Sequence, residues 1–566
     1  MNAAVIALML VVLAHGYGGG PAGPRLPPAD LVVRGAVIHT AAARTPDPSP
    51  GRVPPTAMAI RHGRIVQIGN EPSVAPLIGA GTTVLDLDGL TVLPGLVDSH
   101  AHVLGLGDLL VEVDVTGTAS YAAVVESVRV RAVCTPPGEW VQGRGWDQND
   151  WTEKSFPHHA ALSAAVPDHP VAIGRVDGHA LLVNRRALEL AHITRDTPDP
   201  PGGEILRDAS GEPTGVLVDN AEDLVLALIP PLSPAQREER LLAAMRECAW
   251  YGLTMVGDAG IGRETWDAYQ ALLARGAFPI RINAMASVPG DLADELLARG
   301  PQSGDRLMLR ALKVVADGAL GSRGALLSAD YSDQAGHRGL ETFPFDSLER
   351  VAVRARAKGL QVRVHCIGDL ANTRTLDAFE RAFGGRPRPA LRWAVEHAQV
   401  VRPGDLRRFA RLGVVASMQA THATSDGPWA ERRLGPERVK WSYAWRQFLD
   451  AGARFADGSD FPVESVNPML GLYAAITRCD LAGELPAGGW RPEERLTPGE
   501  ALESFTIWGA WLAFRDRDLG SLEVGKQADF IVVDHDPVLG APAEIPKTRV
   551  LRTVVAGETV YEAPAP

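Results

Sequence analysis

The pattern of hydrophobic and polar positions differs between the ends of the chain and its middle. Near the N-terminus, short apolar runs bounded by turn residues predict β-strands at 31–38, 58–68 (with a turn at His62-Gly63) and 83–87. The same pattern returns near the C-terminus at 529–534 and 550–561. Because the two ends share this pattern, we expect them to pair into one small β-sandwich, with the central part of the chain inserted between them.

In the middle, apolar strand-like runs alternate with helical patterns, which indicates βα units around a parallel sheet. The predicted strands are 93–98, 253–258, 280–286, 309–315, 360–366, 391–397, 413–419 and 454–456. Eight such units predict an α/β fold of the (β/α)8 TIM-like barrel type.

The gap after the first barrel strand is too long for one βα connection, since such loops usually have about 2–6 residues. We therefore expect a large inserted subdomain that caps the substrate site. The predicted organisation is a signal-like or disordered segment at 1–28, the sandwich at 29–92 and 518–562, the barrel at 93–104 and 231–517, and the cap at 105–230.

Composition narrows the class of protein. With 46% hydrophobic and 22% charged residues, the chain is typical of a soluble globular protein. Its 56 basic and 68 acidic residues give a net charge of −12, so we expect no nucleic-acid partner, because phosphate binding needs clustered Lys and Arg. The four cysteines form no CxxC pair, which excludes a disulfide scaffold and a thiolate zinc site.

The N-terminal residues 3–14 form an apolar run, followed by a Gly/Pro-rich stretch at 16–28. The run is shorter than the roughly 20 residues of a transmembrane helix. It is similar to the core of a signal peptide, but no Lys or Arg precedes it. We expect no stable membrane span and a cytoplasmic protein, or an exported one if the run is a signal peptide.

Candidate chemistry gathers where the predicted barrel strands end. His100 and His102 follow the first strand, and alternation along a strand points both side chains to the same side, which suits a divalent metal such as zinc. Further polar residues end or interrupt later strands; they are Lys313, His365, His397 and Asp460. A barrel brings all these strand ends to one face, so we expect one shared site.

Lys313 lies in an apolar run, where a bare ammonium is costly and tends to lose its proton. A neutral amine can react with carbon dioxide to give a carbamate, an anion able to bridge two metal ions. The alternative is an unmodified lysine paired with a carboxylate such as Asp317. The residues alone leave both open.

The chain resembles the amidohydrolase superfamily, in its amidohydrolase-3 group of YtcJ-like and N-substituted formamide deformylase-like enzymes. The resemblance covers nearly everything from about residue 30 to 560. The matching stretches are PGLVDSHAH (94–102), GRGWDQNDW (143–151), DGHALLVNRRAL (177–188), LKVVADGALGSRGALL (312–327), VHCIGDLA (364–371), VEHAQ (395–399), MQATHATSD (418–426), DGSDFPVE (457–464) and GSLEVGKQADFIVVD (520–534).

The resemblance implies a metal site with one or two metals, zinc in the first instance. His100, His102 and Asp460 would bind the first ion, His365 and His397 the second, and Lys313, carboxylated by carbon dioxide, would bridge them. The implied reaction is hydrolysis of a non-peptide C–N bond in an amide, formamide or cyclic amide, with Asp460 as acid and base. The alternatives are ester or lactone hydrolysis at the same site, or a non-catalytic metal-binding sensor.

The cap and the loop after the seventh strand offer substrate contacts. His179 could bond a substrate carbonyl as a catalytic group or anchor a loop. Further candidates for substrate binding are Trp146, Asp147, His422 and Asp426, with Asp150 in the same loop as Asp147. We expect a small-molecule substrate and a homodimer as a possible assembly.

Overall fold

The computed structural model describes residues 27–42 and 54–564, so most of the predicted segment 1–28 lies outside the described residues. Eight parallel strands form the central sheet, in the order β20-β19-β18-β17-β16-β15-β14-β7. They are β7 (Leu96–Ala101), β14 (Leu253–Ile261), β15 (Arg281–Ser287), β16 (Leu307–Val315), β17 (Gln361–Cys366), β18 (Ala394–His397), β19 (Val415–Gln419) and β20 (Arg454–Gly458). The predicted α/β class with a TIM-like barrel is confirmed.

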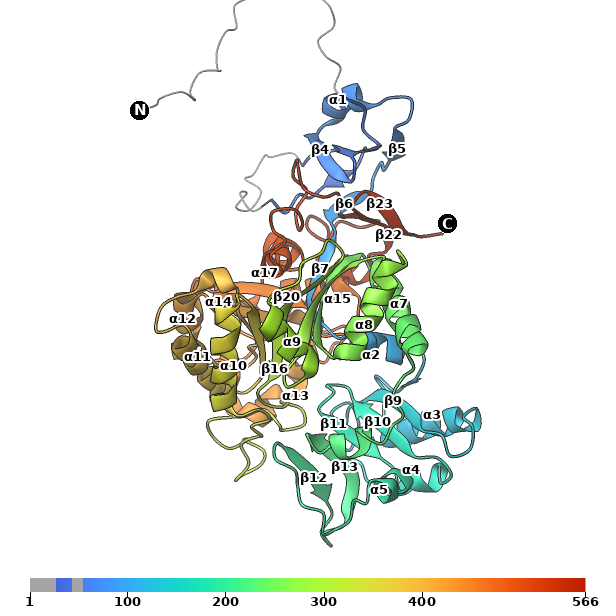
Figure 1. Cartoon of the computed structure of the whole chain (residues 1–566), viewed down its shortest axis with the longest axis vertical. Helices are drawn as coiled ribbons and strands as arrows, with labels where there is room; N and C mark the ends of the chain where they lie inside the picture. Colours follow the sequence, from blue (N-terminus) through green and yellow to red (C-terminus); the bar gives the residue numbers. More distant parts are fainter. Residues whose placement is uncertain (1–26, 43–53, 565–566) are drawn as a thin grey trace, which may run out of the picture.

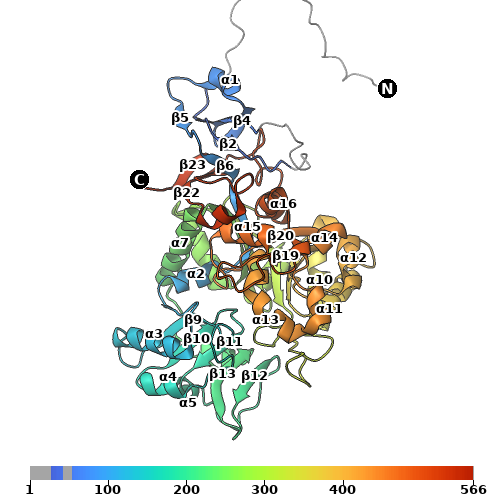
Figure 2. The ribbon, with the colours of Figure 1, turned by 180° about the vertical axis from the view of Figure 1, so that it is seen from behind.

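Helices surround this sheet (Figures 1 and 2), and the largest apolar cluster of the molecule joins their inner faces to the strands. The strands are buried on both faces, as parallel strands covered by helices are. The main covering helices are α7 (Pro234–Trp250), α8 (Arg263–Ala274), α9 (Asp291–Arg299), α10 (Phe345–Ala357), α11 (Asp369–Ala382), α12 (Pro403–Leu412), α14 (Trp445–Asp450) and α15 (Pro468–Thr477).

The first and last strands of the sheet, β7 and β20, meet through a buried carboxylate rather than a regular ladder. Asp98 on β7 accepts hydrogen bonds from the backbone N–H of His100 (3.0 Å), and from the backbone N–H (3.1 Å) and hydroxyl (2.6 Å) of Ser459 just after β20. The N–H of Asp460 also donates to the carbonyl of His100 at 2.8 Å. These bonds hold the end of β7 beside the segment that carries Asp460.

Both chain ends build two sheets beside the barrel (Figure 1). One has the order β4-β3-β1-β5 and the other β2-β6-β21-β22-β23. Strand β21 pairs antiparallel with β6, which joins the C-terminal to the N-terminal segment, and one apolar cluster takes residues from both. The strands are β1 (Leu31–Arg34), β2 (Val37–Ile38), β3 (Ala57–Arg61), β4 (Arg64–Gly69), β5 (Thr83–Asp86), β6 (Thr91–Pro94), β21 (Phe530–Val533), β22 (Val550–Val555) and β23 (Glu558–Glu562). The predicted sandwich from both ends is therefore present.

Two predicted strands are each divided between sheets. The predicted strand 31–38 is β1 in one sheet and β2 in the other. The predicted strand 93–98 is β6 of the sandwich followed by β7 of the barrel. The chain leaves the sandwich at Gly95, whose N–H still donates to the Asp529 carbonyl at 2.9 Å. Continuous apolar patterning cannot show such a division, because both strands are buried.

The long segment between β7 and β14 contains a third sheet, in the order β12-β13-β11-β10-β9-β8, with its own apolar clusters. Its strands are β8 (Val113–Asp114), β9 (Val141–Trp146), β10 (Val171–Arg175), β11 (Ala180–Val183), β12 (Gly203–Arg207) and β13 (Pro213–Asp219), flanked by α3 (Tyr121–Val133), α4 (Ala160–Ala165) and α5 (Arg185–Leu190). It lies at the end of the barrel opposite the sandwich (Figures 1 and 2). Among the described residues, no helix has the length and apolar character needed to span a membrane.

Candidate metal centre

The carboxyl ends of the barrel strands open into a cavity of about 590 Å³ that residues of the inserted segment also line. Five of the six sequence-predicted ligands line this cavity, and the sixth, His100, lies directly beneath them. The lining ligands are His102, Lys313, His365, His397 and Asp460. Lys313 comes from β16, His365 from β17 and His397 from β18, so separate strands bring these groups together.

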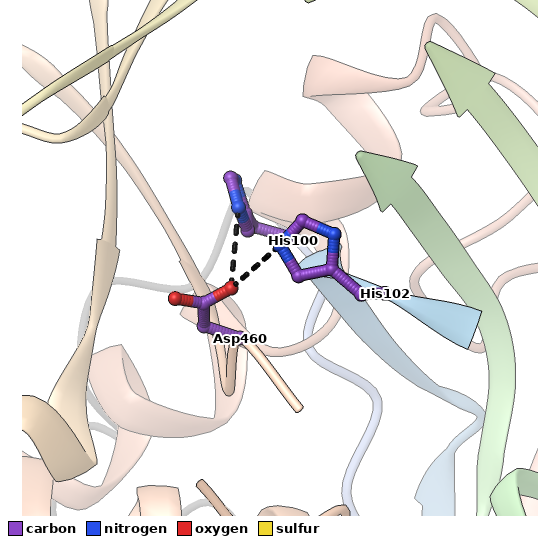
Figure 3. A group of neighbouring side chains, drawn as sticks. All are labelled: His100, His102 and Asp460. Carbon is purple, nitrogen blue, oxygen red and sulfur yellow. Dashed lines mark ion pairs between the residues drawn. The ribbon is translucent and has the colours of Figure 1, made fainter. Parts of the chain in front are cut away.

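The first group of possible ligands is His100, His102 and Asp460, shown in Figure 3. Asp460 Oδ1 lies 3.1 Å from His102 Nε2 and 3.4 Å from His100 Nε2. His100 is fully buried, whereas the side chain of His102 is partly open to the cavity. Two imidazole nitrogens and one carboxylate oxygen thus face a common point, which is a donor set that zinc accepts.

A second group shares the same carboxylate and consists of His397, His422 and Asp460. Asp460 Oδ2 lies 3.7 Å from His422 Nε2 and 4.0 Å from His397 Nδ1. His422 comes from α13 (Ala420–Arg438), directly after β19. Sequence reasoning placed His422 among the substrate contacts, and the structure places it beside the proposed metal ligands.

His365 also belongs to this cluster. Its ring centroid is 4.5 Å from that of His397 and 4.9 Å from that of His179. Its Nε2 is buried without a hydrogen-bond partner among the described residues, as is the Nε2 of His422. Buried polar atoms nearly always have a hydrogen-bond partner. Two buried imidazole nitrogens without such a partner are therefore suited to binding a metal ion. The residues therefore fit a divalent metal.

Neighbouring groups fix the orientation of the histidines. Glu396, fully buried on β18, contacts His100 Nδ1 and the guanidinium of Arg363. Burial alone would raise the pKa of Glu396, but the charges of Arg363 and His100 lower it well below its usual value. Gln419 accepts at 2.7 Å from Nδ1 of His397. With Nδ1 of His100 committed to Glu396, its Nε2 is left to face Asp460, as in other metal sites.

Lys313 is 5% exposed, and its Nζ lies 3.3 Å from His100 Nε2. Burial lowers the pKa of this lysine to about 8. The alternative pairing with Asp317 is absent, because the Asp317 carboxylate accepts hydrogen bonds from three backbone N–H groups instead, those of Leu326, Ile367 and Gly368. Among the described residues Lys313 has no carboxylate partner within 4.0 Å, and His100 is the neighbour of its amine.

Four of the sequence-predicted contacts from the cap and the α13 loop line the cavity together with Asp150; they are Asp147, His179, His422 and Asp426. His179 Nδ1 lies 2.6 Å from Asp219 Oδ1. Burial alone would lower the pKa of His179, but its hydrogen bond with Asp219 and the charge of that carboxylate raise it to about 9. Asp147 pairs with Arg175, which also pairs with Asp177.

Trp146 is placed differently from the sequence-based expectation. It is fully buried in the apolar core of the inserted segment, and its indole N–H donates to the Ile173 carbonyl at 2.8 Å. It does not line the cavity, although Arg144, two residues earlier on β9, does. Simple alternation would put both on one face, but the pairing with β10 shifts between them, from Arg144 opposite Gly174 to Trp146 opposite Arg175, across Gly145 with its positive φ. The GRGW motif alone could not show which face of the strand meets the substrate.

The fold and the site are those of a TIM-like barrel whose strand ends carry groups of His and Asp able to hold a metal ion, at the face where barrel enzymes have their active sites. The family model described as "Amidohydrolase family" matches residues 83–561, and the chain belongs to this family. It is 34% identical to the putative amidohydrolase YtcJ of Bacillus subtilis over 89% of this chain and 96% of that protein. It is 30% identical to the N-substituted formamide deformylase of Arthrobacter pascens over 94% of this chain and 98% of that protein.

The fold comparison agrees with the sequence comparison. The crystal structure of an uncharacterized metal-dependent hydrolase from Pyrococcus horikoshii is similar with a TM-score of 0.73 and 28% identity, over 91% of this chain and 99% of that one. Together with the His and Asp groups of the cavity, these relatives support a divalent metal and a hydrolase.

Proposed function

We propose that this protein is a metal-dependent hydrolase that cleaves a non-peptide C–N bond of a small molecule, in an amide, formamide or cyclic amide. The observation that carries the proposal is Asp460, whose two carboxylate oxygens each face a different group of histidines within one cavity. The formamide deformylase relative, whose name describes cleavage of a C–N bond, supports the type of bond.

We assign His100, His102 and Asp460 to one metal ion, His365 and His397 to a second, and a carboxylated Lys313 to the bridge between them. His422 is available to the second ion through its unpaired Nε2. Bound zinc supplies Lewis acidity toward water and toward a substrate carbonyl. A carbamate on Lys313 would add a negative charge, which offsets part of the charge of two divalent ions in a way that neutral imidazoles cannot.

Asp460 acts as the proton carrier. The charges and hydrogen bonds of its histidine neighbours hold the pKa of its carboxyl well below the usual value, against the effect of burial, so it begins as a base. It accepts a proton from the attacking water and delivers it to the leaving nitrogen, which completes the cleavage. His179, with its Nδ1 bonded to Asp219, donates from Nε2 to the substrate carbonyl oxygen.

The test is a hydrolysis panel of N-acyl, formamide, cyclic-amide and ester compounds, run on the zinc-loaded protein and on His102→Ala. His62→Ala is the matched control, since this histidine lies exposed on the sandwich. We expect turnover of at least one amide-type compound, abolished by His102→Ala and unchanged by the control. Turnover of esters alone would favour ester hydrolysis at the same site. No turnover together with no bound metal would reject the proposal that the protein is a metal-dependent enzyme.

A further inference from the structure

A buried carboxylate at the junction of the inserted segment and the barrel stands behind His179. We propose that Asp219 is the positioning residue of His179, fixing the ring through Nδ1 so that Nε2 works in the cavity, and that the barrel loop after β16 is built to admit this carboxylate. The inference rests on the proposed role of His179 in substrate binding.

Strand register places the two residues opposite each other. Strands β11 and β13 run antiparallel with Ala180 opposite Val218, so the next positions along, His179 and Asp219, also face each other. The backbone N–H of Asp219 donates to the His179 carbonyl at 3.2 Å, and the side chains meet at 2.6 Å between Nδ1 and Oδ1. The pair is thus held by both backbone and side chains.

The Asp219 carboxylate is 2% exposed, and its second oxygen, Oδ2, has no hydrogen-bond partner among the described residues. His179 is the only group that these residues offer to the carboxylate as a hydrogen-bond donor. A buried carboxylate depends strongly on such a partner, because an unpaired buried charge is costly. The orientation of His179 is therefore tied to Asp219 more tightly than an exposed pair would be.

The barrel contributes the space for this carboxylate. A Cβ atom added to Gly318 would meet three Asp219 atoms closer than the 3.0 Å that real Cβ contacts keep, and one added to Gly324 would meet Asp219 Oδ2 in the same way. Both glycines lie in the loop that follows β16, the strand of Lys313. A side chain at Gly318 would therefore displace the Asp219 carboxylate from its present position against His179.

The histidine faces the centre that it would serve. His179 lines the cavity, and its ring centroid lies 4.9 Å from that of His365. With Nδ1 committed to Asp219, Nε2 is the only ring nitrogen left to donate to a ligand in the cavity. The inserted segment thus presents the Nε2–H donor of His179 to the barrel site. Asp219 orients this histidine, and Gly318 and Gly324 in the barrel loop leave room for the Asp219 carboxylate.

The experiment is NMR of the zinc-loaded protein labelled with ¹⁵N-histidine, in which the signal of His179 is assigned from its loss in His179→Gln. We expect a downfield Nδ1–H proton signal, as strong hydrogen bonds to carboxylates give. Asp219→Asn should remove this downfield signal, whereas Asp208→Asn, an exposed aspartate of the same segment, should leave it unchanged. A downfield signal that persists in Asp219→Asn would overturn the proposal.

Gly318→Ala is the second variant, because it keeps both partners and disturbs only their placement. It should shift the same signal and, with an amide that the panel identifies, lower kcat at least tenfold with little change in KM. Gly81→Ala, whose added Cβ would meet open space, is its control. An unchanged signal in Gly318→Ala would also overturn the proposal. The NMR readout needs no turnover, so a failed hydrolysis panel would reject the proposed function without deciding this inference.

Discussion

At the scale of single residues, three histidines of the site are each held by a neighbour that contacts Nδ1 of the ring. His100 contacts Glu396, His397 contacts Gln419, and His179 contacts Asp219. Such partners select the tautomer and the direction in which the free nitrogen points. The centre therefore depends on residues that do not touch a substrate.

Asp460→Asn tests the proton carrier. We expect zinc to remain bound through the histidines while turnover falls about 10²- to 10⁴-fold, the usual contribution of general acid–base catalysis. The substitution adds no backbone strain, because Asp460 has a left-handed backbone conformation (φ +63°) that asparagine also tolerates. Metal content and kcat are measured on the same sample. Activity within about tenfold of wild type, roughly 1.4 kcal/mol in barrier, would exclude Asp460 as the acid–base group.

Lys313→Ala tests the bridge. We expect this variant to bind one zinc ion where the wild type binds two, because the proposed carbamate is lost, and a short-chain carboxylic acid should restore part of the activity. Lys526→Ala is the control, since this lysine is also buried but donates to the Asp516 and Leu519 carbonyls, away from the cavity. The measurements are zinc per chain and turnover with and without the acid. Two tightly bound ions in Lys313→Ala would refute the bridge.

At the scale of elements, an ionic network fastens the barrel to the C-terminal sheet. Arg281 on β15 is fully buried and binds Asp529 at 2.9 Å, just before β21, and Asp305 at 3.0 Å. Burial opposes ionisation of Asp305, but hydrogen bonding to Gln527 and the charges of Arg281 and Arg515 lower its pKa to about 2. The network links the sandwich to the barrel end opposite the cavity.

The pH dependence of stability tests this network. A carboxyl whose folded pKa is lowered stabilises the fold above its unfolded pKa, near 3.8, and that contribution is lost as the pH falls toward 2. We expect Asp305→Asn to destabilise the protein by about 0.5–1 kcal/mol at pH 7, a modest value because the carboxylate is half exposed, and by less at pH 3. Urea unfolding at the two pH values measures this. If the loss of unfolding free energy in Asp305→Asn grew as the pH falls, the lowered pKa of Asp305 would be contradicted. Asp196→Asn, at an exposed position, is the control.

The elements also show which parts of the site sequence patterns can predict. The polar residues that end apolar runs were sufficient to predict that their side chains lie together at one cavity, because parallel strands bring those ends to one face. Patterns did not identify Glu396 or Asp219 as partners. Asp219 meets His179 only through the pairing of β11 with β13, and Glu396 on β18 meets His100 on β7 although these strands are not neighbours in the sheet. Patterns also placed Trp146 in the cavity, although its side chain packs into the core of the inserted segment.

At the scale of the whole molecule, the barrel lies between the sandwich at one end and the inserted segment at the other (Figure 1). The sandwich packs against the barrel end away from the cavity, and the inserted segment supplies part of the cavity wall at the other end. Substrate selection is therefore expected to depend on the inserted segment, through residues such as Asp147 and His179, while the barrel supplies the proposed metal ligands.

The most direct test of the account is the number of metal ions bound per chain. Protein stripped with a chelator is titrated with zinc in bicarbonate buffer, and bound zinc is measured by mass spectrometry after removal of free ions. The account predicts two ions per chain, with hydrolysis of the identified amide restored as they bind. A chain that retains one ion would contradict the two-metal site, and a chain that retains none, or that hydrolyses the amide equally well without zinc, would contradict the central claim.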